Sequence, residues 1–247
     1  MALTFNTDVG TKILSNHLSK ITKDIELNTY RLTTGKKINS ISDDPAGYFM
    51  IERFNRQISS SEIGLENVQV AQSELTYREE TLTSINASLQ SALDALKGYS
   101  SATDANAKAS ILANANAAIK SAEQLKSSAN FNGKELYPAT ANDIKISLGE
   151  ESSITIDADI LGVTVQQTEV TETNIADITA ALNNAILENT KNISSIGAYS
   201  SMLSSAADNL TNKIEAYSQT VETLSSVDIA SETAKLTQNQ ILQQVTA

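Results

Sequence analysis

The chain has 247 residues, of which 40% are hydrophobic but only 4% aromatic, and it contains no Trp and no Cys. Compact cores usually take much of their buried area from aromatic side chains, so this composition favours long helical seams, and the lack of Cys excludes disulfides and thiolate chemistry. Eighteen basic and 29 acidic residues give a formal net charge of −11, which argues against nucleic-acid binding because phosphate contacts need Lys and Arg.

Residues 1–44 are predicted to form a terminal helix and a connecting segment. Apolar residues recur there every three or four positions, with the polar Asn28 among them, at Leu14, Leu18, Ile21, Ile25 and Leu32. Such spacing places side chains on one helical face that packs against a partner. The pattern breaks at Gly35, which predicts a hinge-like connection to the next helix.

Residues 45–129 are predicted to form two ascending helices. Ser42, Asp43 and Asp44 can cap a helix that begins at Pro45 and stops near Gly98, and a shorter helix follows at about 104–128. The long helix carries a seam of Ile51, Phe54, Ile58, Leu65, Val68, Leu75, Leu82, Leu89 and Leu93. Polar members at Gln72, Glu79 and Asn86 either fix the register of the seam or lie at its edge.

Residues 130–173 are predicted to form a small β-hairpin region. Asn130–Gly133 has the composition of a turn. Apolar and polar residues then alternate in three short stretches, around Ile144–Leu148, Ile154–Ile156 and Val163–Val165. A period of two indicates two or three strands, which are expected to lean on the helices because isolated pairs of strands are marginal in water.

Residues 174–224 are predicted to form a descending helix and residues 225–247 a second terminal helix. The descending seam comprises Ile193, Ile196, Leu203, Leu210, Ile214, Val221 and Leu224, and the terminal helix carries Ala234, Leu236 and Ile241. Residues 1–37 have a net charge of +3 and residues 201–247 a net charge of −3, so the two ends should attract each other. The predicted fold is mainly α: a long antiparallel coiled-coil or helical-bundle rod, a small β-hairpin region and paired terminal helices.

No enzymatic site is expected. The single histidine, His17, lies beside the first seam, and Asp43 and Asp44 are better explained as helix caps than as acid–base or metal-binding residues. No phosphate-binding loop or metal-ligand spacing is present, so no catalytic, cofactor or metal site is predicted. No stretch has the roughly 20 apolar residues of a membrane span, and the N-terminus lacks the pattern of a cleaved signal peptide.

Three segments resemble those of bacterial flagellins. They are RLTTGKKINSISDDPAGYFMIERF at 31–54, SSANFNGKELY at 127–137 and SSVDIASETAKLTQNQILQQ at 225–244. The resemblance implies that the N- and C-terminal segments pair as the inner layer of a hollow filament and that a helical bundle with a β-hairpin forms the next layer. With only about 45 non-helical residues between the halves by the turn and strand patterns, the chain resembles a minimal flagellin without variable outer domains.

The resemblance also implies partners and a location. The chain is expected to bind copies of itself, an export chaperone, the type III export apparatus, the filament cap and the hook-junction proteins, and to function outside the cell in the flagellum. Family members usually continue past the last motif with a further short helix, so two alternatives stay open at Ala247, a natural end or a truncation. The positions that match the animal Toll-like receptor site are Ser91, Leu93 and Asn114; these lack the family's Arg and Glu, so weak or absent receptor activation is expected.

Two other functions remain open from the sequence. A hook–filament junction protein shares the terminal motifs, although the Asn130–Gly133 run and the short hairpin favour a flagellin. A coiled-coil adaptor that never polymerises would show the same seams. The first hypothesis is a filament subunit whose terminal apolar faces are satisfied by sister copies.

Overall fold

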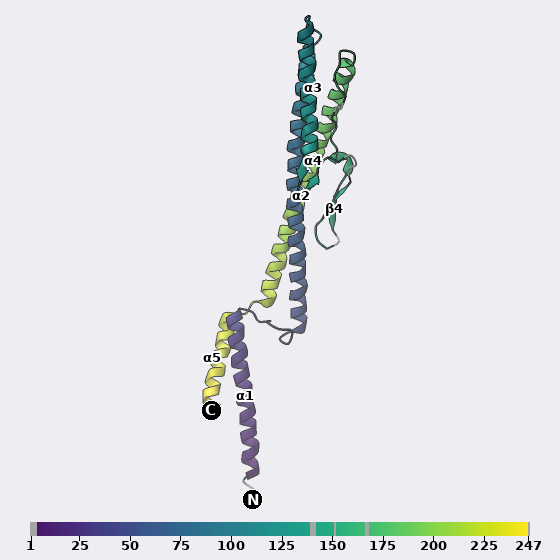
Figure 1. Cartoon of the computed structure of the whole chain (residues 1–247). Helices are drawn as coiled ribbons and strands as arrows, with labels where there is room; N and C mark the ends of the chain where they lie inside the picture. The colour runs from purple at the N-terminus through teal and green to yellow at the C-terminus, as the bar shows by residue number, and fades with distance from the viewer. Residues whose placement is uncertain (1–3, 139–141, 151, 166–167, 247) are drawn as a thin grey trace. The chain divides into compact units, whose positions relative to one another are not determined.

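The computed structural model describes residues 4–138, 142–150, 152–165 and 168–246. The predicted fold class is confirmed: the chain is mainly helical, the long helices pack antiparallel, the sheets are small and the terminal helices pair (Figure 1). The elements are α1 (Thr4–Thr34), α2 (Pro45–Lys97), α3 (Ala105–Ser128), β1 (Asn130–Phe131), β2 (Lys134–Glu135), β3 (Ile144–Ser147), β4 (Ser153–Ile156), the 3-10 helix η1 (Ala158–Leu161), α4 (Ile175–Ser225) and α5 (Ile229–Thr246).

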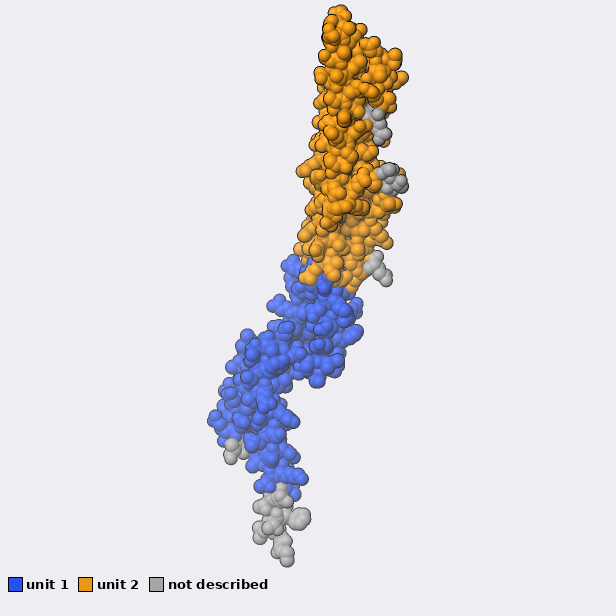
Figure 2. Space-filling view, viewed as in Figure 1, with its two compact units in different colours: residues 1–59, 213–247 blue, residues 60–212 orange. Residues whose placement is uncertain are grey.

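The chain forms two compact units (Figure 2). Unit 1 comprises residues 1–59 and 213–247, and unit 2 comprises residues 60–212. Helices α2 and α4 contribute residues to both units. None of the helices in the described part of the chain combines the length and apolar character needed to cross a membrane.

Aspartate side chains cap the N-termini of helices α2 and α3. Asp44 Oδ1 accepts hydrogen bonds from the backbone N–H groups of Ala46 (3.1 Å) and Gly47 (3.0 Å) at the start of α2. Asp104 caps α3 by accepting from Ala107 N at 3.0 Å. These bonds satisfy amides that have no partner inside the helix. The capping interpretation is therefore correct at Asp44, and α3 begins within one residue of the predicted position.

The preceding Asp43 organises the connection rather than the helix. Its Oδ2 accepts from the backbone N–H groups of Asn39 and Ser40, both at 2.9 Å. Hydrogen bonds from the backbone of Asn39 and Ser40 lower the pKa of this carboxyl group below its ordinary value because they favour the charged form. The two adjacent aspartates thus have different structural roles.

The core of unit 2 lies along the seam between α2 and α4. The predicted seam residues of this unit are buried or half-buried: Leu65, Val68, Leu75, Leu82, Leu89, Leu93, Ile193, Ile196, Leu203 and Leu210. One apolar cluster joins this seam to the hairpin region through Leu136, Ile146 and Ile156, and a second joins it to α3 through Ala115 and Ile119. Each fully buried Leu or Ile contributes about 1.5–3 kcal/mol to stability, so the seam is the main source of stability in this unit.

At one polar position, Glu79, the structure selects the seam-edge alternative, and a neighbouring charged residue is buried instead. Glu79 is exposed, whereas its neighbour Arg78 is 2% exposed. Arg78 Nη2 pairs with Glu74 Oε1 at 2.7 Å, and its Nη1 donates to the Leu136 carbonyl. The Tyr137 hydroxyl donates to the Arg78 carbonyl at 2.9 Å. Burial raises the pKa of this phenol well above its usual value although the guanidinium opposes the shift. Arg78 therefore ties the segment after α3 to the long helix.

The β-hairpin region has two separate hairpins. Asn132 and Gly133 have φ values of 50° and 78° and form the tight turn between β1 and β2, as expected for an Asn-Gly pair. In the second hairpin Ile146 faces Ile154 and Ile144 faces Ile156, and one residue of each pair, Ile146 or Ile156, is buried. The two stretches predicted around Ile144–Leu148 and Ile154–Ile156 thus form strands.

Of the two or three strands predicted in this stretch, the third, around Val163–Val165, does not form. Residues 162–165 form no strand; the backbone N–H and C=O of Thr164 bond instead to the side-chain amide of Asn189, at 2.9 and 3.0 Å. An amide side chain offers the same donor and acceptor as a strand neighbour. Asn189 is fully buried and also donates to Asn86 Oδ1 at 3.1 Å, so it joins the two long helices and this segment.

The tip of the second hairpin lies directly against α2. A Cβ on Gly64 would overlap the Leu148 carbonyl, and Asn67 Nδ2 donates to the Ser147 carbonyl at 3.0 Å. Gly149, with φ of +84°, makes the turn and lies against the Ser60 backbone. Gly64 is therefore required by the close approach of two backbones.

Replacing Arg78 by Met should lower the free energy of unfolding of unit 2 by about 1–3 kcal/mol, since it leaves the buried Leu136 carbonyl and the half-buried Glu74 carboxylate without their partner. The effect would be measured by urea denaturation of the full chain, followed by circular dichroism.

The control is Lys191→Met, because Lys191–Glu188 is also a cation–carboxylate pair within one helix, but with side chains that are 61% and 54% exposed. This variant should unfold almost like the parent, since exposed ion pairs contribute little. Equal destabilisation by both substitutions would contradict a special role for Arg78.

Candidate assembly surfaces at the chain ends

In unit 1 the two predicted breaks in the apolar pattern, one after α1 and one before α5, lie side by side. Lys37 N donates to the Ser225 carbonyl (2.7 Å), Val227 N donates to the Gly35 carbonyl (3.1 Å), and Lys36 and Ser226 form an antiparallel bridge. Gly35 has φ of +70°, a conformation that favours glycine. The connection after α1 and the connection before α5 thus hold each other, and this contact sets the pairing of the two terminal helices.

Helix α5 begins at a cap and runs beside α1 (Figure 1). Asp228 Oδ1 accepts from the backbone N–H groups of Ala230 (3.0 Å) and Ser231 (3.1 Å). Further along, Gln243 Nε2 lies 3.5 Å from Thr22 Oγ1. The predicted pairing of the terminal helices is therefore confirmed.

A buried carboxylate lies between the two terminal helices. Glu232 is 3% exposed; its Oε1 lies 3.7 Å from Arg31 Nη1 and its Oε2 lies 3.2 Å from Lys235 Nζ. With its amide oriented so that both atoms are satisfied, Asn28 donates to Glu232 Oε1 (2.8 Å) and accepts from Asn239 Nδ2 (3.2 Å). The sequence predicted an attraction between a basic N-terminal segment and an acidic C-terminal segment, and this attraction is concentrated in the Arg31–Glu232 pair. Asn28 makes a specific polar contact between α1 and α5.

The face of α5 that meets α1 is more polar than predicted. Glu232 is buried, and Leu236, Asn239 and Gln243 are half-buried, at a spacing of four, three and four residues. The predicted residues Ala234 and Ile241 are exposed and lie seven positions apart on another face. The predicted set therefore combined two faces: Leu236 belongs to the one that pairs within the chain, and Ala234 and Ile241 belong to the one that points outward.

Helix α1 is covered over part of its length. Ile21 is buried, and Leu18, Ile25 and Leu32 are half-buried. Towards the N-terminus the large apolar side chains are exposed: Val9 (55%), Ile13 (54%) and Leu14 (49%). With 31 residues against 18, α1 is about 46 Å long and α5 about 27 Å, so α5 cannot cover all of α1.

Outward apolar residues also occur on α5. Ile241 is 56% exposed, Leu242 41% and Val245 77%. Within one chain Leu14, Ala234 and Ile241 are thus exposed, whereas Ile21 is buried. Contiguous exposed apolar residues on a small element are typical of protein–protein contacts.

The remaining seam residues of unit 1 pack between the first turns of α2 and the last turns of α4. Phe54 and Tyr217 have ring centroids 5.3 Å apart. Ile51 is buried, and the other predicted members are half-buried: Phe54, Ile58, Ile214, Val221 and Leu224. The seam prediction therefore extends correctly into this unit.

The three receptor-like positions have different surroundings. Ser91 and Asn114 are exposed, and the Ser91 hydroxyl donates to the Ala87 carbonyl at 2.9 Å. Leu93 is 5% exposed and belongs to the core cluster that α3 shares with the long helices. Its side chain is not available at the surface.

Two important polar residues, Arg78 and Glu232, were missed from the sequence. Each is a charged side chain on a helix whose seam was predicted from other residues, and its burial depends on partners distant in the chain. The only signal was spacing: Arg78 lies three residues after Leu75 and four before Leu82, and Glu232 lies four before Leu236. Among the described residues no group of His, Asp and Glu side chains could hold a metal ion.

Comparison with known proteins identifies two regions. Residues 5–142 match the bacterial flagellin N-terminal helical region, and residues 179–247 match the bacterial flagellin C-terminal helical region. Only residues 143–178 separate them, which agrees with the absence of outer domains between the two matched regions. The first region alone covers more than half of the chain.

Individual relatives differ in the share of their own length that this chain covers. The chain is 29% identical to a flagellin of Salmonella typhimurium over 75% of this chain and 41% of that protein. It is 26% identical to B-type flagellin of Pseudomonas aeruginosa over 64% of this chain and 32% of that protein. A flagellin of Halalkalibacterium halodurans is 26% identical over 87% of this chain and 82% of its own length. The chain thus spans less than half the length of the first two.

A solved structure shares the fold. It is described as a flagellar hook-associated protein of Vibrio parahaemolyticus, with a TM-score of 0.51 and 16% identity over 75% of this chain and 97% of that one. At this identity the likeness concerns the fold alone. The paired terminal helices, the long antiparallel seam and the two matched regions lead to one conclusion: the chain belongs to the bacterial flagellin family.

Proposed function

We propose that the chain is a structural subunit that self-assembles into the bacterial flagellar filament outside the cell. The observation that carries this proposal is the outward apolar surface of the terminal helices, formed by Val9, Ile13 and Leu14 on α1 and by Ile241 and Val245 on α5. Free subunits stay soluble through their net charge of −11, and the exposed apolar area drives association when copies meet.

Within this proposal, residues 1–44 and 225–247 form the inner layer of the filament. Residues 45–129, 130–173 and 174–224 form the next layer, as ascending helices, hairpin region and descending helix. Contacts between unlike surfaces of successive copies produce open growth instead of a closed ring. Export through the type III apparatus, a chaperone that covers α5, a distal cap and contact with hook-junction proteins complete the proposal.

Ile241→Asp should abolish polymerisation while leaving the free subunit folded, because the side chain is 56% exposed and a charge there would be buried only between copies. Electron microscopy and sedimentation would measure the polymer. Gln240→Asp, also on the exposed surface of α5, adds the same charge and should still polymerise.

Leu236→Asp should also prevent assembly, but by disturbing the pairing of α5 with α1, since Leu236 is half-buried on the face that meets α1.

Normal filaments from Ile241→Asp would contradict the proposed inner-layer role. If the unmodified chain formed only short end-caps, the result would favour a hook–filament junction protein. If it formed no assemblies at all, the result would favour a coiled-coil adaptor.

Glu232→Ala should loosen the pairing of α1 and α5, because it removes the partner of Arg31 and of the Asn28 amide. Losing a buried hydrogen-bonded charge typically costs about 1–3 kcal/mol, so hydrogen exchange in α5 of the free subunit should accelerate about 5- to 150-fold.

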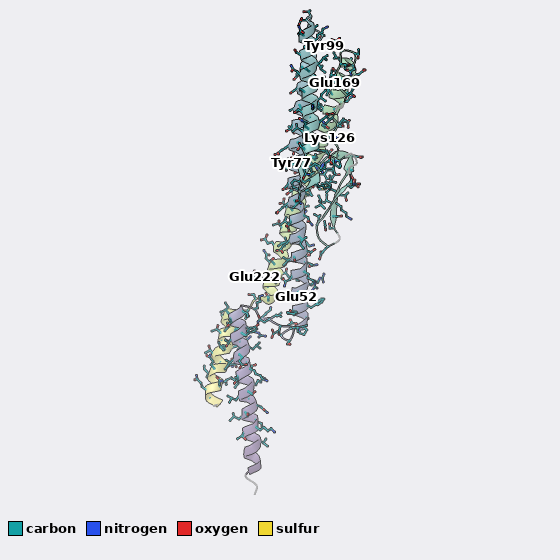
Figure 3. The ribbon with its side chains drawn as sticks, in the orientation of Figure 1. Glu52, Tyr77, Tyr99, Lys126, Glu169 and Glu222 are labelled. Atoms are coloured by element: carbon teal, nitrogen blue, oxygen red, sulfur yellow. The ribbon has the colours of Figure 1, made fainter. Side chains whose placement is uncertain are left out.

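The control is Glu222→Ala, an exposed carboxylate of α4 in the same unit (Figure 3). It should leave exchange in α5 unchanged, and amides of unit 2 should be unaffected in both variants. Unchanged exchange in Glu232→Ala would show that the buried carboxylate does not hold the ends together.

Toll-like receptor activation by this chain is expected to be weak or absent. Ser91 and Asn114 present no charge at the positions that resemble the family's receptor site, and Leu93 is buried. An Arg fork for bidentate pairing is therefore missing. A cell reporter assay would measure activation, and a full-strength response would contradict this expectation.

A further inference from the structure

The excess negative charge of the chain is confined to unit 2. Unit 1 has ten basic and ten acidic residues, whereas unit 2 has eight basic and nineteen acidic residues. Copies that met through the acidic surfaces of unit 2 alone would repel each other. An assembly of such chains needs a neutral or basic surface opposite unit 2, and unit 1 is the part of the chain that can supply one.

A basic patch lies on α2 within unit 1. It consists of Phe49 (63% exposed), Met50 (46% exposed), Arg53 and Arg56, all exposed. Phe49, Arg53 and Arg56 are spaced by four and three residues and therefore share one helical face. Neither guanidinium forms an ion pair with a described residue. The patch combines exposed apolar area with two unpaired positive charges.

An acidic patch lies on α2 within unit 2. Its apolar members, Ile63 (58% exposed), Val70 (50%) and Tyr77 (38%), recur every seven residues; Tyr77 is labelled in Figure 3. Its charged members, Glu62, Glu66 and Glu80, are exposed and form no ion pair with a described residue. A repeat of seven keeps these side chains on the outward face of the helix, away from the buried seam.

We propose that the acidic patch of one copy receives the basic patch of the next copy, a contact that rests on the proposed filament function. The two patches match in chemistry: each presents large apolar side chains beside unpaired charges, and the charges have opposite signs. Complementary charges at such a surface select the partner and fix its register, and the apolar residues supply buried area.

This contact is heterologous. Each copy uses its basic patch towards one neighbour and its acidic patch towards another, so one patch of each kind remains free at the ends of any row of copies. Repetition of such a contact gives an open helical polymer. Like-charged faces do not meet, which makes association of two acidic patches unfavourable and gives the contact a direction.

Two charge-reversed variants of the full chain test the contact. Arg53→Glu with Arg56→Glu makes both patches acidic, and Glu62→Lys with Glu66→Lys makes both basic. Each variant alone should raise the critical concentration for polymerisation at least about tenfold, because like charges directly opposite each other disfavour the contact. An equimolar mixture should polymerise again, since each patch then finds an opposite charge on the other variant.

The chain with all four substitutions should polymerise within about threefold of the unmodified critical concentration, because the complementarity is restored with reversed sign. Lys134→Glu with Lys145→Glu is the control, since it changes the net charge as much as the basic-patch variant at exposed positions on the hairpins. It should polymerise like the unmodified chain.

Normal polymerisation by each two-site variant alone, or failure of the mixture and of the fourfold variant, would overturn the contact while leaving the filament function in place. Absence of polymer from the unmodified chain would overturn the filament function and the contact together. Sedimentation and electron microscopy distinguish these outcomes.

Discussion

The structure depends on the burial of apolar side chains between antiparallel helices α2 and α4, which in unit 2 form two clusters. With 4% aromatic residues and no disulfides, stability has to come from many Leu, Ile, Val and Ala side chains, each with a modest contribution. Long helices provide this because a repeat of three and four keeps the seam on one face over many turns. The hairpin region and α3 add their apolar residues to the same two clusters, so neither needs a core of its own.

Buried polar groups give this seam its specificity. Apolar side chains at regular spacing would allow neighbouring registers, whereas buried Arg78 bonds the Leu136 carbonyl and so aligns the segment after α3 with α2. Asn189 similarly bonds Asn86 and both backbone groups of Thr164. Moving either residue by one turn would leave buried polar atoms without partners, which is costly. Shape and stability come from the apolar residues, and alignment comes from these polar contacts.

The contact between the terminal helices α1 and α5 differs in character from the apolar seam between α2 and α4. Their mutual contact is partly polar, centred on Glu232, and much of their apolar surface points outward. A surface of this kind stabilises the isolated chain little, but it is suited to association with other copies. Such a surface is what the proposed assembly of copies through the chain ends requires.

The sequence by itself determined the helices, their caps, the breaks at Gly35 and Ser225, and almost all of the α2–α4 seam. These features are local: periodicity, Asp-Pro and Asn-Gly signals act over a few residues, and no distant partner is needed to recognise them.

Only the tertiary structure decided which faces meet and which polar residues are buried. The spacing could not separate Leu236 from Ile241, because α5 has two candidate faces and the choice depends on Asn28 and Arg31 in α1. Burial of Arg78 instead of Glu79, and replacement of a strand at Val163–Val165 by contacts from Asn189, likewise depend on groups 25 or more residues away along the chain. Periodicity shows which residues share a face, but the partner of each face is fixed by hydrogen bonds and packing that form only when distant segments come together.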